Sequence, residues 1–136
     1  MDDAKIKYLE MIQGVINRMA ANSFSLKGWG VTLATGIFAI AASKDANVLL
    51  LTVAYIPVLL FWFLDSYYLQ QERKFRLVYK NAVKTDPKDI VFNLAPPKKG
   101  NWKEKTCFIQ SLYSRTEMWF YVPFAILIAI IQIFVF

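Results

Sequence analysis

Met118–Phe136 reads MWFYVPFAILIAIIQIFVF, nineteen residues in which Gln132 is the only strongly polar side chain. A helix rises about 1.5 Å per residue, so this stretch is long enough to cross the roughly 30 Å hydrocarbon core of a bilayer. Trp119 and Tyr121 near its start suit the membrane–water interface. The stretch therefore predicts a transmembrane helix over residues 118–136.

Two further apolar blocks precede it. Residues 26–43 (LKGWGVTLATGIFAIAAS) and 48–69 (VLLLTVAYIPVLLFWFLDSYYL) are separated only by a short polar connection. We expect two antiparallel membrane helices, the second kinked at Pro57, because neighbouring helices can satisfy the carbonyl that a proline leaves free. The second helix is predicted to continue as an extension over residues 70–84.

The remaining segments are more polar. Apolar residues recur at helical spacing over residues 2–24, which predicts an amphipathic N-terminal helix. Residues 85–117 contain several turn signals and are expected to form a loop region, with a possible short strand at Asp89–Leu94. We therefore predict an all-α integral membrane protein with a single membrane domain over residues 1–136: an amphipathic N-terminal helix, a transmembrane helical hairpin with cytoplasmic extensions, and a third, C-terminal transmembrane helix.

The distribution of charge predicts the orientation. The chain is 57% hydrophobic with a net charge of +6, and Lys44 is the only one of its 16 basic residues in the short connection between the first two spans. Basic residues favour the cytoplasmic side. We therefore expect a bacterial inner (plasma) membrane protein with a cytoplasmic N-terminus and a periplasmic or extracellular C-terminus. Binding of nucleic acid is the less favoured reading of the positive charge.

Two ion pairs follow from the geometry of an antiparallel hairpin. Lys27 lies 18 residues before Asp45 and Asp65 lies 20 after it, so their side chains should reach a similar depth. A carboxylate near the end of a span is costly unless it is paired. By the same count, Arg18 and Glu72 should pair further along the extensions. These pairs either lock the hairpin together or belong to an ion pathway or gate.

Two surfaces are candidates for contacts. One is a face of small residues that permits close helix packing, within the subunit or in an oligomer. It comprises Gly28, Thr32, Gly36 and Ala39. The other is a basic patch drawn to anionic headgroups or to a cytoplasmic partner. It comprises Lys98, Lys99, Trp102, Lys103 and Lys105.

Enzymatic chemistry is not expected. The chain has one cysteine, Cys107, and no histidine, so no Cys–His pair or Cys/His metal cluster can form. It also lacks a phosphate-binding loop and a dinucleotide-binding glycine pattern. We therefore predict no cofactor and no catalytic residue.

Three stretches carry a resemblance to a known group. They are NSFSLKGWGVTLATGIFAIAA (residues 22–42), FWFLDSYYLQQERKFRLVYKNAV (61–83) and SRTEMWFYVPFAIL (114–127). Together they resemble small uncharacterised bacterial inner-membrane proteins, some of them associated with antiphage defence loci. The architecture is also similar to that of two-helix membrane effectors that perforate membranes when a nucleotide-sensing partner is triggered, an analogy of shape alone.

The expected function follows from these features together. A small protein without catalytic residues, with a small-residue face and cytoplasmic extensions, fits a homo-oligomer that perturbs or permeabilises the membrane. The resemblance implies a role as an antiphage-defence effector. The alternative is a non-conducting scaffold or sensor subunit that recruits a cytoplasmic partner.

Overall fold

The computed structural model describes residues 3–41, 48–97, 100–101 and 104–135, and within these ranges the chain is helical with no strand. The helical elements are α1 (Asp3–Ala41), α2 (Val48–Val53), α3 (Tyr55–Lys84), the 3₁₀ helix η1 (Pro87–Asp89), α4 (Phe108–Leu112) and α5 (Arg115–Val135). The all-helical class predicted from the sequence is confirmed.

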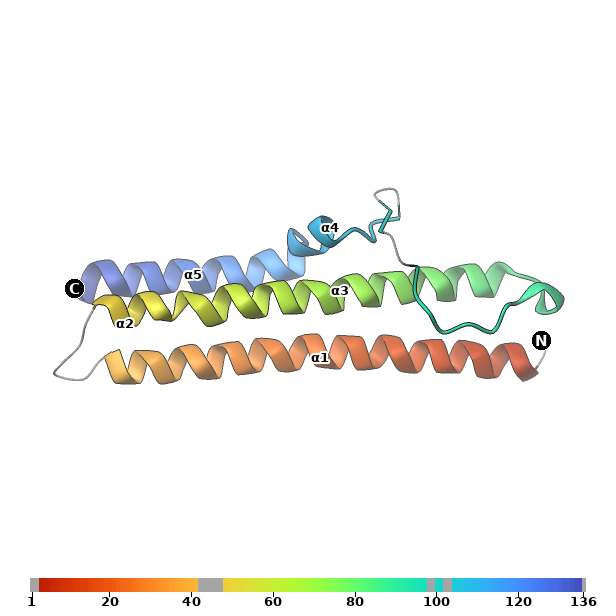
Figure 1. Cartoon of the computed structure of the whole chain (residues 1–136), viewed down its shortest axis with the longest axis horizontal. Helices are drawn as coiled ribbons and strands as arrows, with labels where there is room; N and C mark the ends of the chain where they lie inside the picture. The colour runs from red at the N-terminus through yellow and green to blue at the C-terminus, as the bar shows by residue number, and fades with distance from the viewer. Residues whose placement is uncertain (1–2, 42–47, 98–99, 102–103, 136) are drawn as a thin grey trace.

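The long helices form an elongated bundle (Figure 1). Helix α1 runs antiparallel to α2 and α3 along their whole length, and α5 lies along the first half of α3. The start of α1 lies beside the end of α3, whereas the end of α5 lies beside α2. The two ends of the bundle therefore differ. At one end the start of α1 lies beside the end of α3, and at the other end α1, α2 and α5 lie together.

Helix α1 is longer than any element predicted from the sequence. The predicted amphipathic helix (2–24) and first span (26–43) form one unbroken helix within Asp3–Ala41. The ends of these predictions, residues 2 and 42–43, lie outside the described residues. Asp3 stands in the first turn, where a carboxylate meets the positive end of the helix dipole.

The second predicted span is interrupted just before its proline. Helix α2 ends at Val53 and α3 begins at Tyr55, with Ala54 N–H donating to the Leu51 carbonyl at 3.0 Å. Pro57 has no N–H to donate to the carbonyl four residues earlier, that of Val53. The interruption lies at the residues whose helical hydrogen bond the proline removes.

Two apolar clusters hold the helices together. The first joins the start of α1 to the end of α3, and its buried members are Tyr8, Ile12, Val15, Ile16, Phe75 and Ala82. The second joins α3 to α5, with α1 side chains packed against it, and its buried members are Ala54, Val58, Phe61, Tyr121 and Ile128. Burying a large apolar side chain away from water contributes about 1.5–3 kcal/mol, so the first cluster is a substantial stabilising unit.

Among the residues that the structure describes, two stretches are long and apolar enough to cross a membrane: Leu51–Lys84 and Arg115–Phe134. They contain most of the second predicted span and most of the third. The first predicted span is not among them, and its last two residues lie outside the described part of the chain.

The predicted loop region carries more helix than expected. Residues 85–117 contain η1, α4 and the first turn of α5, which begins at Arg115 rather than Met118. The possible strand at Asp89–Leu94 is wrong: Asp89 closes η1 and residues 90–94 have no regular structure. Tyr8 Oη donates to the Asn93 carbonyl at 2.6 Å, which anchors this segment to α1.

Lys5 connects the same end of α1 to the end of α3. Its side chain is buried, and Nζ donates to the carbonyl oxygens of Val83 (3.1 Å) and Thr85 (2.8 Å). The last carbonyls of a helix lack partners within the helix and carry partial negative charge. The Lys5 ammonium supplies both a donor and a compensating charge to the end of α3.

Candidate functional site

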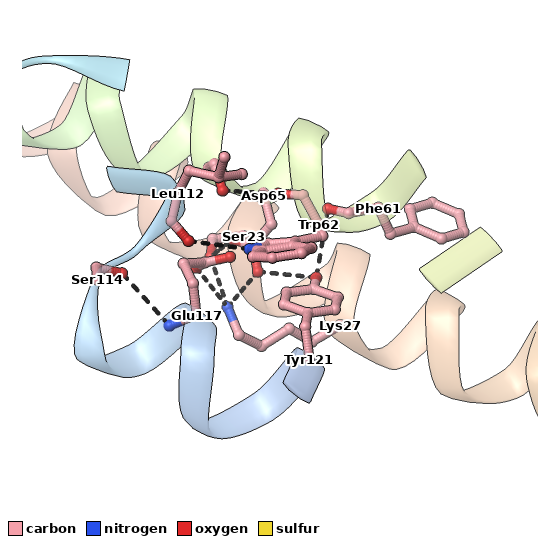
Figure 2. Close-up of polar contacts among 10 residues, drawn as sticks. Ser23, Lys27, Phe61, Trp62, Asp65, Leu112, Ser114, Glu117 and Tyr121 are labelled. Carbon is pink, nitrogen blue, oxygen red and sulfur yellow. Dashed lines mark hydrogen bonds and ion pairs between the residues drawn. The ribbon is translucent and has the colours of Figure 1, made fainter. Parts of the chain in front are cut away.

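A polar cluster lies where α1, α3 and α5 meet (Figure 2). Its members, called here the charge cluster, are Ser23, Lys27, Asp65, Glu117 and Tyr121. Ser23 and Lys27 are one helical turn apart on α1, and Glu117 and Tyr121 are one turn apart on α5. The inward faces of α1 and α5 thus both contact Asp65 of α3.

Asp65 is completely buried and has three hydrogen-bonding or ion-pair partners in the cluster. Its Oδ2 forms an ion pair with Lys27 Nζ and accepts a hydrogen bond from Tyr121 Oη at 2.9 Å. Its Oδ1 accepts a hydrogen bond from Ser23 Oγ. A buried carboxylate needs this number of donors, because desolvation is otherwise too costly.

Glu117 is the second carboxyl group of the cluster. Its side chain is 1% exposed, and Oε1 lies 3.3 Å from Lys27 Nζ. Its backbone N–H donates to Ser114 Oγ at 3.3 Å, so Ser114 caps the start of α5 and fixes where Glu117 stands. Lys27 therefore bridges two carboxyl groups that belong to different helices.

Aromatic side chains surround the charge cluster. Trp62 Nε1 donates to the Leu112 carbonyl at 3.0 Å, which ties the end of α4 to α3. The Trp62 and Tyr121 rings stack with centroids 6.3 Å apart. Lys27 Nζ lies 5.9 Å from the centre of the Phe120 ring, within the range of cation–π attraction. The charged groups are thus enclosed by aromatic surface.

The two predicted ion pairs have different outcomes. Lys27 and Asp65 are paired, as their similar depth in the hairpin predicts. The predicted pair of Arg18 with Glu72 is wrong, because Glu72 Oε1 pairs with Arg76 Nη2 at 2.8 Å on its own helix. An i,i+4 partner is always within reach on a helix surface, whereas Arg18 is exposed on α1.

Sequence analysis missed Glu117, although a signal for its position was present. The stretch Ser114–Glu117 reads SRTE, which has the spacing of a helix-capping box. That pattern predicts a helix from Arg115, and it places Glu117 in the first turn of the helix rather than in the preceding loop. The observed side chain departs from the motif, because it reaches Lys27 on α1.

The small-residue face is not packed within the subunit. Gly28, Thr32, Gly36 and Ala39 are all exposed, so the intrasubunit reading is wrong. The inward face instead carries Gly30 and the fully buried Ala34. Residue 34 lies about 200° around the helix from residue 32, which places the two faces on opposite sides of α1.

Most of the predicted basic patch cannot be placed. Lys98, Lys99, Trp102 and Lys103 lie outside the described residues. Lys105 is exposed and has a positive φ of 57°, and its carbonyl accepts a hydrogen bond from Arg73 Nη1 at 3.3 Å. Lys105 therefore lies beside α3, next to Arg73.

The charge cluster brings together one ammonium group, two carboxyl groups and two hydroxyl groups from three helices of the described part of the chain. Such a site can bind a charged group or a proton. Among the described residues, no group of three or more His, Cys, Asp or Glu side chains could hold a metal ion. Cys107 is free and half-buried at the start of α4. Comparison with protein-family models, curated proteins and solved structures finds no match to this chain.

Proposed function

We propose that the protein is a three-span homo-oligomer of the bacterial inner membrane that permeabilises the bilayer. The observation that carries the proposal is the outward face of α1, where small and hydroxylated residues are left exposed between larger apolar side chains. The face comprises Gly28, Thr32, Thr35, Gly36 and Ala39.

Exposure supports a membrane location. In the most apolar window of Arg115–Phe134 only 17% of the residues are buried inside the structure, and in that of Leu51–Lys84 only 33% are. A core helix of a water-soluble protein would bury most of its apolar side chains, whereas lipid favours exposed ones. Examples are Ile126, Ile133 and Phe134, which are 52%, 74% and 83% exposed.

The third span in the proposal is the second half of α1. This half of the helix lies beside α2 and the first half of α3, at the same level as α5 (Figure 1). Apart from Lys27, the basic residues of α1 and α3 lie in the first half of α1 and the second half of α3, at the other end of the bundle, which favours a cytoplasmic N-terminus. The charge cluster then lies at the cytoplasmic edge of the spans.

Self-association through α1 explains why small residues face outward. Apolar side chains gain little by leaving lipid, so helices associate in membranes through close packing at small residues. An added Cβ at Gly28 or Gly36 meets nothing within 4 Å, so both positions are open to a second chain. The larger exposed residues Trp29 and Leu33 flank the face on one side.

Permeabilisation is the activity that such an assembly supports. The hydroxyls of Thr32 and Thr35 donate to the carbonyls of Gly28 and Val31 on their own helix, so they are tolerated in a membrane. In a ring of subunits these residues would gather near a shared axis. A role as an antiphage-defence effector is the physiological part of this proposal and is supported by the resemblance alone.

The test is release of an encapsulated dye from lipid vesicles by purified protein, with membrane potential in expressing cells as the cellular counterpart. Wild type should release dye, and Gly36→Leu should release several-fold less at equal incorporation. Gly14→Leu is the matched control: Gly14 is exposed on the same helix with nothing within 4 Å, outside the proposed span. No release by wild type under any ionic condition would contradict the proposal.

A scaffold that recruits a cytoplasmic partner is the second candidate, and one observation favours it. Val91 and Phe92 are 77% and 58% exposed in the segment that returns along the bundle. Exposed apolar side chains next to basic residues are typical of protein contact sites. Retention of a stoichiometric partner after solubilisation, lost in Val91→Asp/Phe92→Asp but not in Val83→Asp, would favour the scaffold.

A further inference from the structure

We infer that Glu117 carries a bound proton and donates it in a hydrogen bond to Asp65, which makes the charge cluster a proton-binding site. The inference concerns a ligand of the cluster and holds whether or not the assembly permeabilises a membrane. It rests on three features of the site: an oxygen without a partner, the balance of charges, and the number of acceptor positions on Asp65.

The first feature is the second oxygen of Glu117. Oε2 is buried and has no hydrogen-bond partner within the described part of the chain, while Oε1 faces Lys27. An ionised carboxylate that leaves one oxygen buried and unpaired costs free energy comparable to a lost charged hydrogen bond. A proton on Glu117 removes most of this cost, because Oε2 becomes part of a neutral group that can donate.

The second feature is the balance of charges. Helix α1 brings the ammonium of Lys27, α3 brings Asp65, and α5 brings Glu117 and the neutral phenol of Tyr121 (Figure 2). With both carboxyl groups ionised, the enclosed cluster would carry a net negative charge. Two buried carboxylates at one ammonium cannot both ionise cheaply, and one bound proton brings the cluster to neutrality.

The third feature assigns the proton. A carboxylate has about four acceptor positions, and Asp65 uses three of them for Lys27, Ser23 and Tyr121. Lys27 Nζ contacts one oxygen of each carboxyl group, Asp65 Oδ2 and Glu117 Oε1, so the two carboxyl groups converge on the same ammonium. A protonated Glu117 therefore donates to the fourth position, Asp65 keeps its ion pair with Lys27, and Oε2 gains the partner that it lacks.

The bound proton links three helices. With the proton in place, Lys27 of α1 and Glu117 of α5 both bond to Asp65 of α3. When the proton leaves to water as hydronium or to a buffer base, Asp65 and Glu117 repel each other across the same ammonium. The start of α5 is then held less tightly against α1 and α3, so proton binding controls how firmly α5 is docked.

Infrared spectroscopy of the whole purified protein in lipid at neutral pH tests the inference. Wild type should show the carbonyl band of a buried protonated carboxyl group, which lies apart from the carboxylate band and shifts in heavy water. Glu117→Gln should remove this band. Asp65→Asn should also remove it, because Glu117 then has Lys27 to itself and ionises. Glu104→Gln, a change at an exposed carboxyl group, should leave it intact.

A measurement without substitutions covers the case in which a variant does not fold. Wild-type protein labelled with ¹³C at the glutamate side-chain carboxyl should show the same band moved to lower frequency, and ¹³C-aspartate should leave it in place. Absence of the band in folded wild type, or a band that moves with aspartate rather than glutamate, overturns the assignment.

Discussion

Lys27 Nζ lies 3.3 Å from Oε1 of Glu117, although the two residues are 90 positions apart in the chain. The same ammonium forms an ion pair with Asp65 of α3. One side chain thus makes the polar contact between all three long helices. Its removal should therefore affect the docking of both α3 and α5.

Lys27→Met should destabilise the folded protein strongly. The change leaves Asp65 buried without its cation, and breaking one partner of a buried ion pair costs about 3 kcal/mol or more. Unfolding in mixed micelles with increasing denaturing detergent measures the difference. Lys7→Met, at an exposed position of the same helix, is the control and should change stability little. Equal stability of the two variants would contradict this role for Lys27.

Tyr121→Phe should destabilise by about 1.5–3 kcal/mol, the usual contribution of a hydrogen bond to a charged group. The change removes the Oη donor to Asp65 and keeps the ring that stacks on Trp62. The same unfolding assay measures it, with Tyr113→Phe as control because Tyr113 is 62% exposed. A neutral Tyr121→Phe would mean that Asp65 does not depend on this donor.

Gly30 should tolerate a methyl group but not a larger side chain. A Cβ at this position lies 3.5 Å from Phe61 Cδ2, an ordinary contact. Gly30→Ala should therefore fold normally, with a helix propensity gain of up to about 1 kcal/mol. Gly30→Leu should separate α1 from α3 and destabilise by about 1–3 kcal/mol, as overpacking does. A fully stable Gly30→Leu in the micelle assay would show that α1 can rotate away from Phe61.

Lys5→Met should loosen the end of α3 without unfolding the bundle. The substitution removes the donor to the Val83 and Thr85 carbonyls, an effect of about 1 kcal/mol confined to the last turn. Amide hydrogen exchange should become faster over residues 80–85 and stay unchanged near Asp65. Faster exchange along the whole chain would instead show that Lys5 supports global stability.

Helix type and the depth of the Lys27–Asp65 pair could be predicted because both follow from local rules. Apolar periodicity gives the helices, and counting residues from a short connection gives relative depth. Neither rule depends on how a helix is rotated about its own axis. The pairing of Arg18 with Glu72 failed under the same rule because Glu72 has a competing partner on its own helix.

The rotation of α1 could not be predicted from its sequence alone. Two faces of α1 carry small residues, one with Gly28 and Gly36 and the other with Gly30 and Ala34. The choice between them depends on Lys27 reaching Asp65, and on Phe61 filling the space above Gly30. Both are contacts between helices, so small-residue spacing within one helix does not decide it.

The charge cluster was only half predictable for a related reason. Asp65 stands out because it interrupts an apolar block, whereas Glu117 lies in a polar stretch before the last span. The helix start at Arg115 brings Glu117 inward, and this start depends on the Ser114 cap. A carboxyl group at a helix start is common, so its burial becomes visible only when three helices are assembled.

In the proposed assembly, the outward face of α1 joins copies of this chain in a membrane. Light scattering of the detergent-solubilised particle, corrected for bound detergent, measures the mass of the assembly directly. We predict a discrete oligomer for wild type and for Gly14→Leu, and a smaller particle for Gly28→Leu and Gly36→Leu with unchanged helix content. A monomeric wild type, or an oligomer that both substitutions leave intact, would contradict the claim.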